Sequence, residues 1–341
     1  MALNYTTLQA LINDKYIKVL QDVIFTKKSY LLSTMKAKAK TFNERKIVVP
    51  LEYGKSSTTR FLPKYGTITL TDQELVTAAE YTPQMMSDAL VIALEDELQN
   101  KSDMAITKLI TVKMKNLQKS VEEYLSTHLW KRTTTVTSGD WNHLDFLVSS
   151  SALTVGGIAT SDASWWLSKS LDCSTLSGTS TTEPDLIDST KQEYLPKLIR
   201  RGIAMSNAVD GSNPDLIVMP QYLWDLLEQI NEEKRRFSVD DRIEKMGFSN
   251  LTFRGIPIVA DNYMVVAQTG DTDGRIYFLK MEYLYMFLNS GADFSLGEFQ
   301  KQPNSNVRSA IFNAYGNIAI SNRRGQVVFT DLYSPQSYVN E

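Results

Sequence analysis

Short apolar runs bounded by turn residues crowd the last third of the chain. Residues 250–261, 275–280 and 314–324 are rich in β-branched and aromatic side chains, and Gly, Pro or Asn flanks each run. This composition is typical of β-strands. None of the three runs carries a nucleophile beside a base, a phosphate-binding loop or the spacing of metal ligands. The pattern predicts a framework protein that is built into something larger.

Two segments have the apolar period of a helix. Thr6 and Gln9 form a capping box, and the following apolar positions share one face: Leu8, Leu11, Ile12, Val19, Leu20, Val23 and Ile24. A second helix is predicted from Ser102 to Trp130, with Ile106, Leu109, Ile110, Leu117, Val121, Tyr124 and Leu125 on its apolar stripe. At 1.5 Å per residue this helix is about 43 Å long, which suits the spine of a flat, extended subunit.

Between these helices the pattern predicts an extended two-stranded ribbon. Residues 47–53 form the outgoing strand, residues 67–70 form the returning strand, and Gly54, Ser56 and Ser57 supply the turn. A lone two-stranded ribbon is marginally stable in water, so we expect it to rest on another surface. Further on, residues 90–94 are predicted to form a buried strand.

The ribbon and the segment after it carry opposite charge. Basic residues dominate from 36 to 64, and acidic residues dominate from 72 to 103. Both can be solvated surfaces; alternatively, the basic ribbon of one copy lies across the acidic region of the next. Arg323 and Arg324 can reach phosphate or pair with a neighbour's carboxylates. The predicted contacts between subunits are therefore Arg45, Lys46, Lys55, Arg60, Lys64, Glu95, Asp96, Glu97, Arg323 and Arg324.

The middle of the chain alternates between helix and strand patterns. Residues 149–182 are mostly Ser, Thr or Gly, but Trp165 and Trp166 predict an ordered excursion, because two adjacent indoles are unlikely to stay in water. A helix over 184–205, kinked or split at Pro196, precedes a buried strand over 215–219. Pro220 then opens a helix that a charged turn, 232–236, follows. The block predicts an inserted α/β domain.

Composition excludes several classes of protein. The 341 residues suffice for about two domains, and a net charge of −3 gives no bulk attraction to nucleic acid or anionic membrane. Cys173 is the only cysteine, so no internal disulfide forms. We expect no secretion signal and no membrane span. The acidic clusters 95–97 and 240–241, with His128 and His143, show no catalytic or zinc spacing. We predict no enzyme, no cofactor and no metal.

Several of these features together resemble the major capsid proteins of tailed bacteriophages, whose fold is named after phage Hong Kong ninety-seven. The features occur in the same order: Gly157-Ile158 before Trp165-Trp166, the run 214–218, the run 247–259 with its Arg-Gly-Ile-Pro, the run 277–279 and Asn322-Arg323-Arg324. The rest of the chain agrees in layout, with an N-terminal arm, a long hairpin and a spine helix.

The resemblance implies an α+β fold in five parts. These are an N-terminal helical arm (1–44), an extended β-hairpin loop (45–75), the first part of a peripheral domain with the spine helix (76–138), an inserted axial α/β domain (139–289) and the second part of the peripheral domain (290–341). It implies hexamers and pentamers of an icosahedral shell around a phage genome, assembled in the cytoplasm of a bacterial host. The implied partners are further copies, a separate scaffolding protein, a portal and decoration proteins, with packaged DNA nearby but not specifically bound and no membrane.

Three other classes stay open on the sequence. An encapsulin-like shell around protein cargo differs from a phage capsid mainly in its contents. A soluble hydrolase that uses the acidic clusters would be a monomer or small oligomer with a concave acidic pocket. A tail or other virion component is the third.

Overall fold

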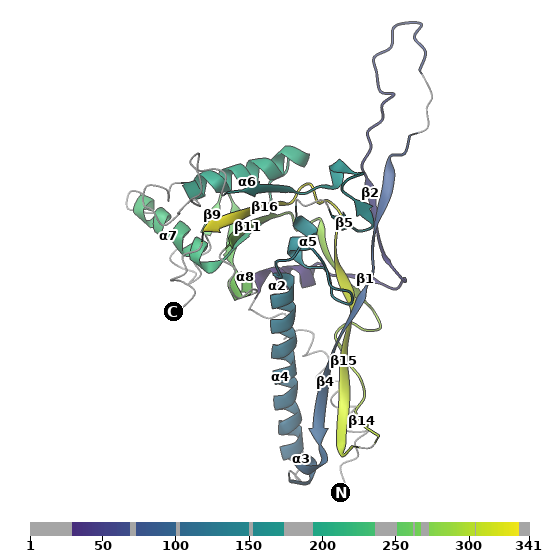
Figure 1. Ribbon diagram of the computed structural model, residues 1–341, viewed down its shortest axis with the longest axis vertical. Helices are drawn as coiled ribbons and strands as arrows, with labels where there is room; N and C mark the ends of the chain where they lie inside the picture. The colour runs from purple at the N-terminus through teal and green to yellow at the C-terminus, as the bar shows by residue number, and fades with distance from the viewer. Residues whose placement is uncertain are drawn as a thin grey trace.

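The structure is a computed structural model that describes residues 29–68, 73–99, 103–149, 153–173, 194–235, 251–261, 263–266, 273–303 and 305–333. The predicted arm helix over 6–24 and the cap at Ser102 lie outside these residues. Figure 1 shows two packed bodies, a narrow loop that projects at one end, and a long helix beside a long hairpin at the other.

Helices and strands alternate irregularly along the chain, as expected for an α+β protein. The helices are α2 (Tyr30–Ala37), α3 (Leu94–Gln99), α4 (Asp103–Leu129), α5 (Leu144–Val148), the 3₁₀ turn η1 (Ser164–Trp166), α6 (Tyr194–Asp210), α7 (Gln221–Arg235) and α8 (Tyr263–Val266). The strands up to residue 219 are β1 (Lys40–Phe42), β2 (Ile47–Glu52), β3 (Val76–Tyr81), β4 (Gln84–Ala93), β5 (Thr154–Val155), β6 (Ile158–Ala159), β7 (Lys169–Asp172) and β8 (Leu216–Met219). The later strands are β9 (Leu251–Phe253), β10 (Ile256–Ala260), β11 (Asp273–Leu279), β12 (Leu284–Asn289), β13 (Ser295–Leu296), β14 (Gln300–Lys301), β15 (Val307–Ile320) and β16 (Val327–Tyr333).

The first body is organised around β15. This strand pairs antiparallel with β4 from Val307 opposite Ala93 to Gly316 opposite Gln84, and its last residues pair with β12. Strand β1 extends the sheet beyond β12. The predicted strand 90–94 is the end of β4, but it is not buried on both sides. Leu90 and Ile92 are buried, whereas Val91 is exposed, because alternate residues of a strand face opposite sides of the sheet.

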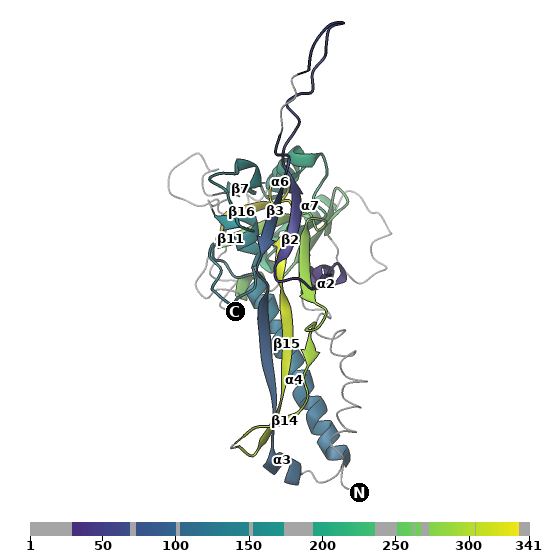
Figure 2. The same cartoon turned by 90° about the vertical axis from the view of Figure 1, so that its right-hand side faces the viewer.

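The spine helix α4 covers the buried face of this hairpin (Figures 1 and 2). Its 27 residues confirm the predicted long helix, which at 1.5 Å per residue is about 40 Å long. The buried stripe follows the period of a helix: Ile110, Met114, Leu117, Val121, Leu125 and Leu129. Tyr124 was predicted on this stripe and is exposed, because it stands about 100° around the helix from Leu125.

The second body is a six-stranded sheet in the order β7-β16-β11-β8-β10-β9, counted over the described residues. All four residues of β8 are buried, so the strand predicted over 215–219 is confirmed as a central one. The turn between β9 and β10 contains Arg254 and Gly255, both with positive φ, as a two-residue hairpin turn requires.

Helices α6 and α7 cover one face of the second sheet. Leu195, Ile199, Leu223 and Leu227 from the helices share a core with alternate residues of the strands: Ile217, Met219, Ile276, Phe278, Val327 and Phe329. The residues between them, such as Val218, Tyr277 and Val328, point to the other face and join the core of the first body. The two bodies are therefore packed together through a continuous apolar contact.

Three predicted boundaries of the helical block are corrected. Pro196 lies in the first described turn of α6 and does not split it, because the first turn needs no backbone donor at that position. Helix α6 continues to Asp210, beyond the predicted end at 205. The predicted turn at 232–236 is helical as far as Arg235.

The predicted ribbon has its returning strand later in the chain than expected. Strand β2 confirms the outgoing strand, but it pairs with β3, from Ile47 opposite Tyr81 to Glu52 opposite Val76. The predicted returning strand covered residues 67–70; residues 67 and 68 are irregular, so the prediction is wrong for these two, and residues 69 and 70 lie outside the described part of the chain. The alternating exposure of β3 was hidden by its Thr-Ala-Ala-Glu composition, which lacks large apolar residues.

Each of the two sheets contains strands from both sides of residue 289 in the sequence. Strand β12 precedes this position and belongs to the first sheet, while β16 follows it and belongs to the second. The predicted division at 289/290 thus does not coincide with the boundary between sheets. The assignment of the sheets to axial and peripheral domains of a shell subunit stays a prediction.

Candidate assembly surfaces

The extended loop between β2 and β3 projects away from both bodies (Figures 1 and 2). Its hydrogen bonds hold the loop against itself. The Ser57 amide donates to Gln73 Oε1 at 3.0 Å, the Gln73 amide donates to Ser57 Oγ at 2.8 Å, and the Arg60 guanidinium donates to the Thr67 carbonyl. These bonds keep the loop narrow without resting it on a surface of its own chain.

Large apolar side chains gather at the end of this loop. Phe61 is 106% exposed and Tyr65 is 87% exposed, and Leu62 and Ile68 are exposed beside them. We call these four residues the loop tip. Burying one Phe side chain stabilises a complex by about 1.5–3 kcal/mol, so a tip of this composition is costly unless a partner covers it.

A second exposed apolar surface lies on the long hairpin of the first body. Met85 and Val91 of β4 and Ile311 of β15 point away from α4 and are each about half exposed. Cross-strand pairing places Ile311 opposite Ala89, on the same face as the two β4 residues. We call these three residues the outer hairpin face. Figure 1 shows the extended loop projecting from one end of the molecule while the β4–β15 hairpin runs to the other end, so the loop points away from the outer hairpin face of its own chain.

The predicted basic contacts are exposed, but one of them already has a partner. Lys46 pairs with Glu80 across the β2–β3 stem at 2.6 Å. Arg45, Lys55 and Lys64 are exposed and form no ion pair with another described residue. Arg60 is exposed as well, although its guanidinium bonds the Thr67 carbonyl. The structure thus leaves four of the five basic residues available for a neighbour's carboxylates.

The predicted acidic contacts lie on the short helix α3. Glu95 is exposed, and Asp96 pairs with Lys113 of α4 at 3.1 Å. Lys113 also donates to the Val91 carbonyl at 3.0 Å, on the free edge of β4. A lysine at this position hinders pairing with a foreign strand. The side chain of Glu97 and the cluster 240–241 lie outside the described residues.

Arg323 was predicted to contact a neighbouring subunit, and this prediction is wrong. Its side chain is fully buried. Its guanidinium donates from Nε to the Leu147 carbonyl at 2.8 Å and from Nη2 to the Ser149 carbonyl at 3.0 Å, and it lies over the Trp166 ring. Burial lowers the pKa of Arg323 to about 10. The adjacent Arg324 is exposed and stays a candidate contact.

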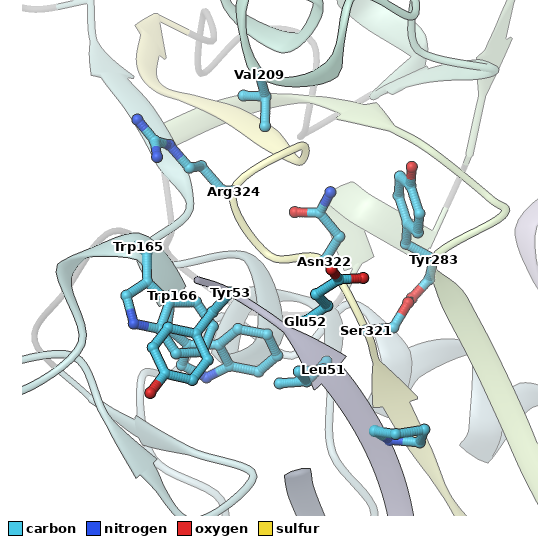
Figure 3. A pocket seen from close by; sticks show the side chains of 11 residues that line it. Leu51, Glu52, Tyr53, Trp165, Trp166, Val209, Tyr283, Ser321, Asn322 and Arg324 are labelled. Carbon is cyan, nitrogen blue, oxygen red and sulfur yellow. The ribbon is translucent and has the colours of Figure 1, made fainter. Parts of the chain in front are cut away.

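Trp166 and Trp165 anchor residues 153–173 of the predicted Ser-rich excursion, whereas residues 150–152 and 174–182 lie outside the described part of the chain. Trp166 is buried and its indole N–H donates to the Val155 carbonyl at 2.9 Å. Trp165 meets Trp166 edge to face at 5.8 Å and stacks on Tyr53 with ring centroids 4.7 Å apart and planes 10° apart. Figure 3 shows Tyr53 and the two indoles together at one side of a cleft of about 350 Å³, which Glu52, Tyr283, Asn322 and Arg324 also line.

The two histidines have structural contacts at the end of α4. His128 Nε2 bonds the Trp141 carbonyl at 2.7 Å, and His143 Nε2 bonds the Thr133 carbonyl at 2.5 Å. Cys173 is buried. Within the described ranges, no three His, Cys, Asp or Glu residues are grouped as metal ligands would be. No helix in the described part of the chain is both long and apolar enough to cross a lipid bilayer.

The sequence reasoning missed the loop tip and the outer hairpin face. A signal for the tip exists: Phe61, Leu62 and Tyr65 are three large apolar residues in a segment whose other residues are those of a turn. No helix or strand period explains them, which is itself a sign of contact with another molecule. The outer hairpin face had no such signal, because an alternating strand gives no indication of which face is covered.

Solved structures similar to this chain include phage capsids and a virus-like particle. A chain of the cyanophage A-1(L) capsid matches with a TM-score of 0.59 and 12% identity, over 91% of this chain and 97% of the other. A virus-like particle from Pyrococcus furiosus matches with a TM-score of 0.50 and 11% identity, over 92% and 99%. A chain in the procapsid of satellite phage P4, solved with its size determination (Sid) protein, matches with a TM-score of 0.50 and 11% identity, over 96% of each. No family model and no curated protein matches the sequence.

These similarities confirm the predicted fold. The chain has the α+β fold of tailed-phage major capsid proteins, and the likeness extends over nearly the whole length of both chains. At this level of identity the likeness concerns the fold alone.

Proposed function

We propose that this chain is the major capsid protein of a tailed phage, a structural subunit whose copies close into an icosahedral shell around the genome. The observation that carries the proposal is the loop tip, where Phe61 and Tyr65 stand in solvent at the end of a loop that holds them away from their own chain. A subunit that acted alone would gain nothing from this arrangement.

The loop tip of one copy packs on the outer hairpin face of the next. Both surfaces are apolar and exposed, and the loop and the hairpin extend toward opposite ends of the molecule, so a head-to-tail contact satisfies both. Such a heterologous contact closes into rings when the rotation between copies permits, and hexamers and pentamers are the rings of an icosahedral shell. Arg45 before β2, with Lys55, Arg60 and Lys64 along the loop, meets the acidic side of the neighbour, and these charges set the orientation of the contact.

The wider setting follows from the same proposal. The shell assembles in the cytoplasm of a bacterial host and forms part of the virion. A separate scaffolding protein, a portal and decoration proteins are its further partners. The similar P4 procapsid was solved with an accessory protein, which supports the need for such helpers. The net charge of −3 supports packaging without specific binding of DNA.

The test is a pair of substitutions at the loop tip. Phe61→Ser with Tyr65→Ser leaves the fold intact, because both side chains are largely exposed, but removes apolar area that a neighbour would bury. We expect at least about a tenfold loss of closed shells, since each lost contact weakens association by more than 1.4 kcal/mol. Negative-stain microscopy and sedimentation measure the yield.

The matched control is Phe61→Leu with Tyr65→Phe, which keeps the tip apolar and should assemble normally. Thermal unfolding of both variants should equal that of the wild type. Wild-type yields of closed shells from the serine variant would remove the loop tip from the proposal.

A shell around protein cargo is the second candidate, and the likeness to the Pyrococcus furiosus virus-like particle favours it. The contents of purified native particles separate the two candidates: nucleic acid supports the phage capsid, whereas a co-purifying enzyme supports the cargo compartment.

A further inference from the structure

The base of the extended loop is attached to the second body through aromatic rings. Strand β2 ends at Glu52, and the next residue, Tyr53, stacks on Trp165. On the backbone, the amides of Tyr53 and Gly54 both donate to the Leu75 carbonyl, at 3.0 and 3.3 Å, which closes the loop. The hydrogen bonds described above for residues 55–68 stay within the loop. The direction in which the loop leaves the body therefore depends on the contacts that Tyr53 makes.

The support beneath Tyr53 is rigid. We call Trp165 and Trp166 the indole bracket. Trp166 is fixed by its bond to the Val155 carbonyl and by the guanidinium of Arg323, which is itself bonded to the carbonyls of Leu147 and Ser149. The Glu80 amide donates to the Gly156 carbonyl at 2.9 Å, which ties the same excursion to the stem of the loop. The bracket thus holds Trp165 in place against the base of the loop.

The cleft beside the stack gives the loop room to leave it. It has a volume of about 350 Å³ and opens next to Tyr53, with Glu52 and Arg324 on its walls (Figure 3). Without the stack, no side chain fills this space, and the Tyr53 ring can turn into it.

We infer that Trp165 is a positioning residue for assembly, whose stack with Tyr53 sets the direction in which the loop leaves the body. The inference rests on the proposed function, in which the loop tip must meet a particular surface of the next copy. The eight residue-to-residue steps from Tyr53 to Phe61 span up to about 26 Å when extended. A swing of about 20° at the base then moves Phe61 by about 9 Å, well beyond the 4–4.5 Å within which apolar side chains make contact.

The experiment compares Trp165→Ala with Trp165→Phe in the full-length chain. Hydrogen exchange at the Tyr53 and Gly54 amides reports the closure of the loop base before assembly, and electron microscopy of the assembled product reports the loop direction and the fraction of closed shells. We expect about fivefold faster exchange in the alanine variant, the fold-change that corresponds to one stacked aromatic pair. Closed shells give way to open or irregular particles, and the chain still folds, with a lower thermal unfolding temperature because Trp165 also packs on Trp166.

Two further variants make the test specific. Tyr53→Ala should reproduce the assembly defect, and the double variant should be no worse than either single one, because both remove the same stack. Trp165→Phe keeps a stacking ring and should restore wild-type exchange and shells.

Wild-type exchange at residues 53 and 54, together with normal shells in the alanine variant, would overturn the inference. A failure of the proposed function looks different: the wild-type chain itself then forms no shells with its partners. In that case the exchange measurement alone decides whether the bracket holds the loop.

Discussion

Arg323 illustrates how far a residue's role depends on its surroundings. In the sequence it is one of two adjacent arginines after a strand, which suggests a charged surface. In the structure it crosses the interior, bonds two backbone carbonyls and lies over an indole. A guanidinium suits this position because its planar group donates in several directions and covers an aromatic face. Arg323 thereby supports Trp166, which contacts the Trp165 ring that stacks on Tyr53 at the base of the extended loop.

His143 makes the stability of the fold dependent on pH. Its Nε2 faces the Thr133 carbonyl, so Nε2 carries the proton, and its Nδ1 is buried without a hydrogen-bond partner among the described residues. Burial lowers the pKa of His143, the positive charge of nearby His128 and Lys131 acts in the same direction, and the Thr133 carbonyl and Asp145 oppose them. A proton on Nδ1 would therefore be buried with no acceptor.

We predict that the free energy of unfolding falls as the pH drops below about 6.5, the usual pKa of an unfolded histidine. The unfolded chain then binds a proton at this residue while the folded chain resists it. Above that pH the contribution is fully present. Denaturant unfolding at about pH 7.5 and pH 5 measures the difference.

His143→Gln keeps a donor for the Thr133 carbonyl and cannot be protonated, so it should lose less stability between these pH values than the wild type. An equal loss in both proteins would mean that other groups cause the pH dependence.

Among the elements, α6 lies unusually close to the second sheet at Gly202. A Cβ added at this glycine would stand 2.2 Å from the ring of Phe278 on β11, so the helix can approach the sheet only without a side chain there. A glycine within a helix costs about 1 kcal/mol relative to alanine. Here that cost is outweighed by the close contact it permits.

We predict that Gly202→Ala destabilises the fold by about 1–3 kcal/mol, although alanine is the better helix former, because the methyl group pushes α6 away from Phe278. Chemical denaturation measures the change. In a Phe278→Leu background the smaller side chain leaves room, so the same substitution should cost less. A stabilising Gly202→Ala in the wild-type background would contradict the close packing.

The elements with a strong period were predictable, and those defined by contacts were not. The spine helix and β8 follow from their apolar residues alone, and the two tryptophans correctly predicted an ordered excursion. Strand β3 was missed because Val76–Tyr81 carries mostly small or polar residues, so its pairing with β2 decides its structure. The burial of Arg323 was beyond reach as well, because it depends on the tertiary arrangement of segments distant in sequence.

For the whole molecule, the charge of the loop bears on association and not on folding. Arg45, Lys55, Arg60 and Lys64 are exposed, so their reversal removes no buried contact. Lys46 is excluded from this set, because it pairs with Glu80 in its own stem. Attraction between exposed charges is weak for each pair but steers two large surfaces as they meet.

We predict that changing these four residues to Glu leaves thermal unfolding nearly unchanged and strongly slows shell formation. Light scattering during assembly measures the rate. Wild-type assembly should slow in about 1 M salt, where screening removes the steering over more than about 3 Å, and the reversed variant should be much less sensitive to salt. Rapid assembly of the variant at low salt would show that the loop binds by its apolar tip alone.

The place of β16 in the second sheet determines when, during synthesis, a subunit can complete its fold. This strand lies between β7 and β11, yet residues 327–333 leave the ribosome after every other strand of that sheet. A nascent chain therefore lacks the strand that pairs with both β7 and β11 until translation has passed this point. In the proposed shell, a copy interrupted before this strand lacks a finished second body behind its loop and offers a neighbour no complete surface.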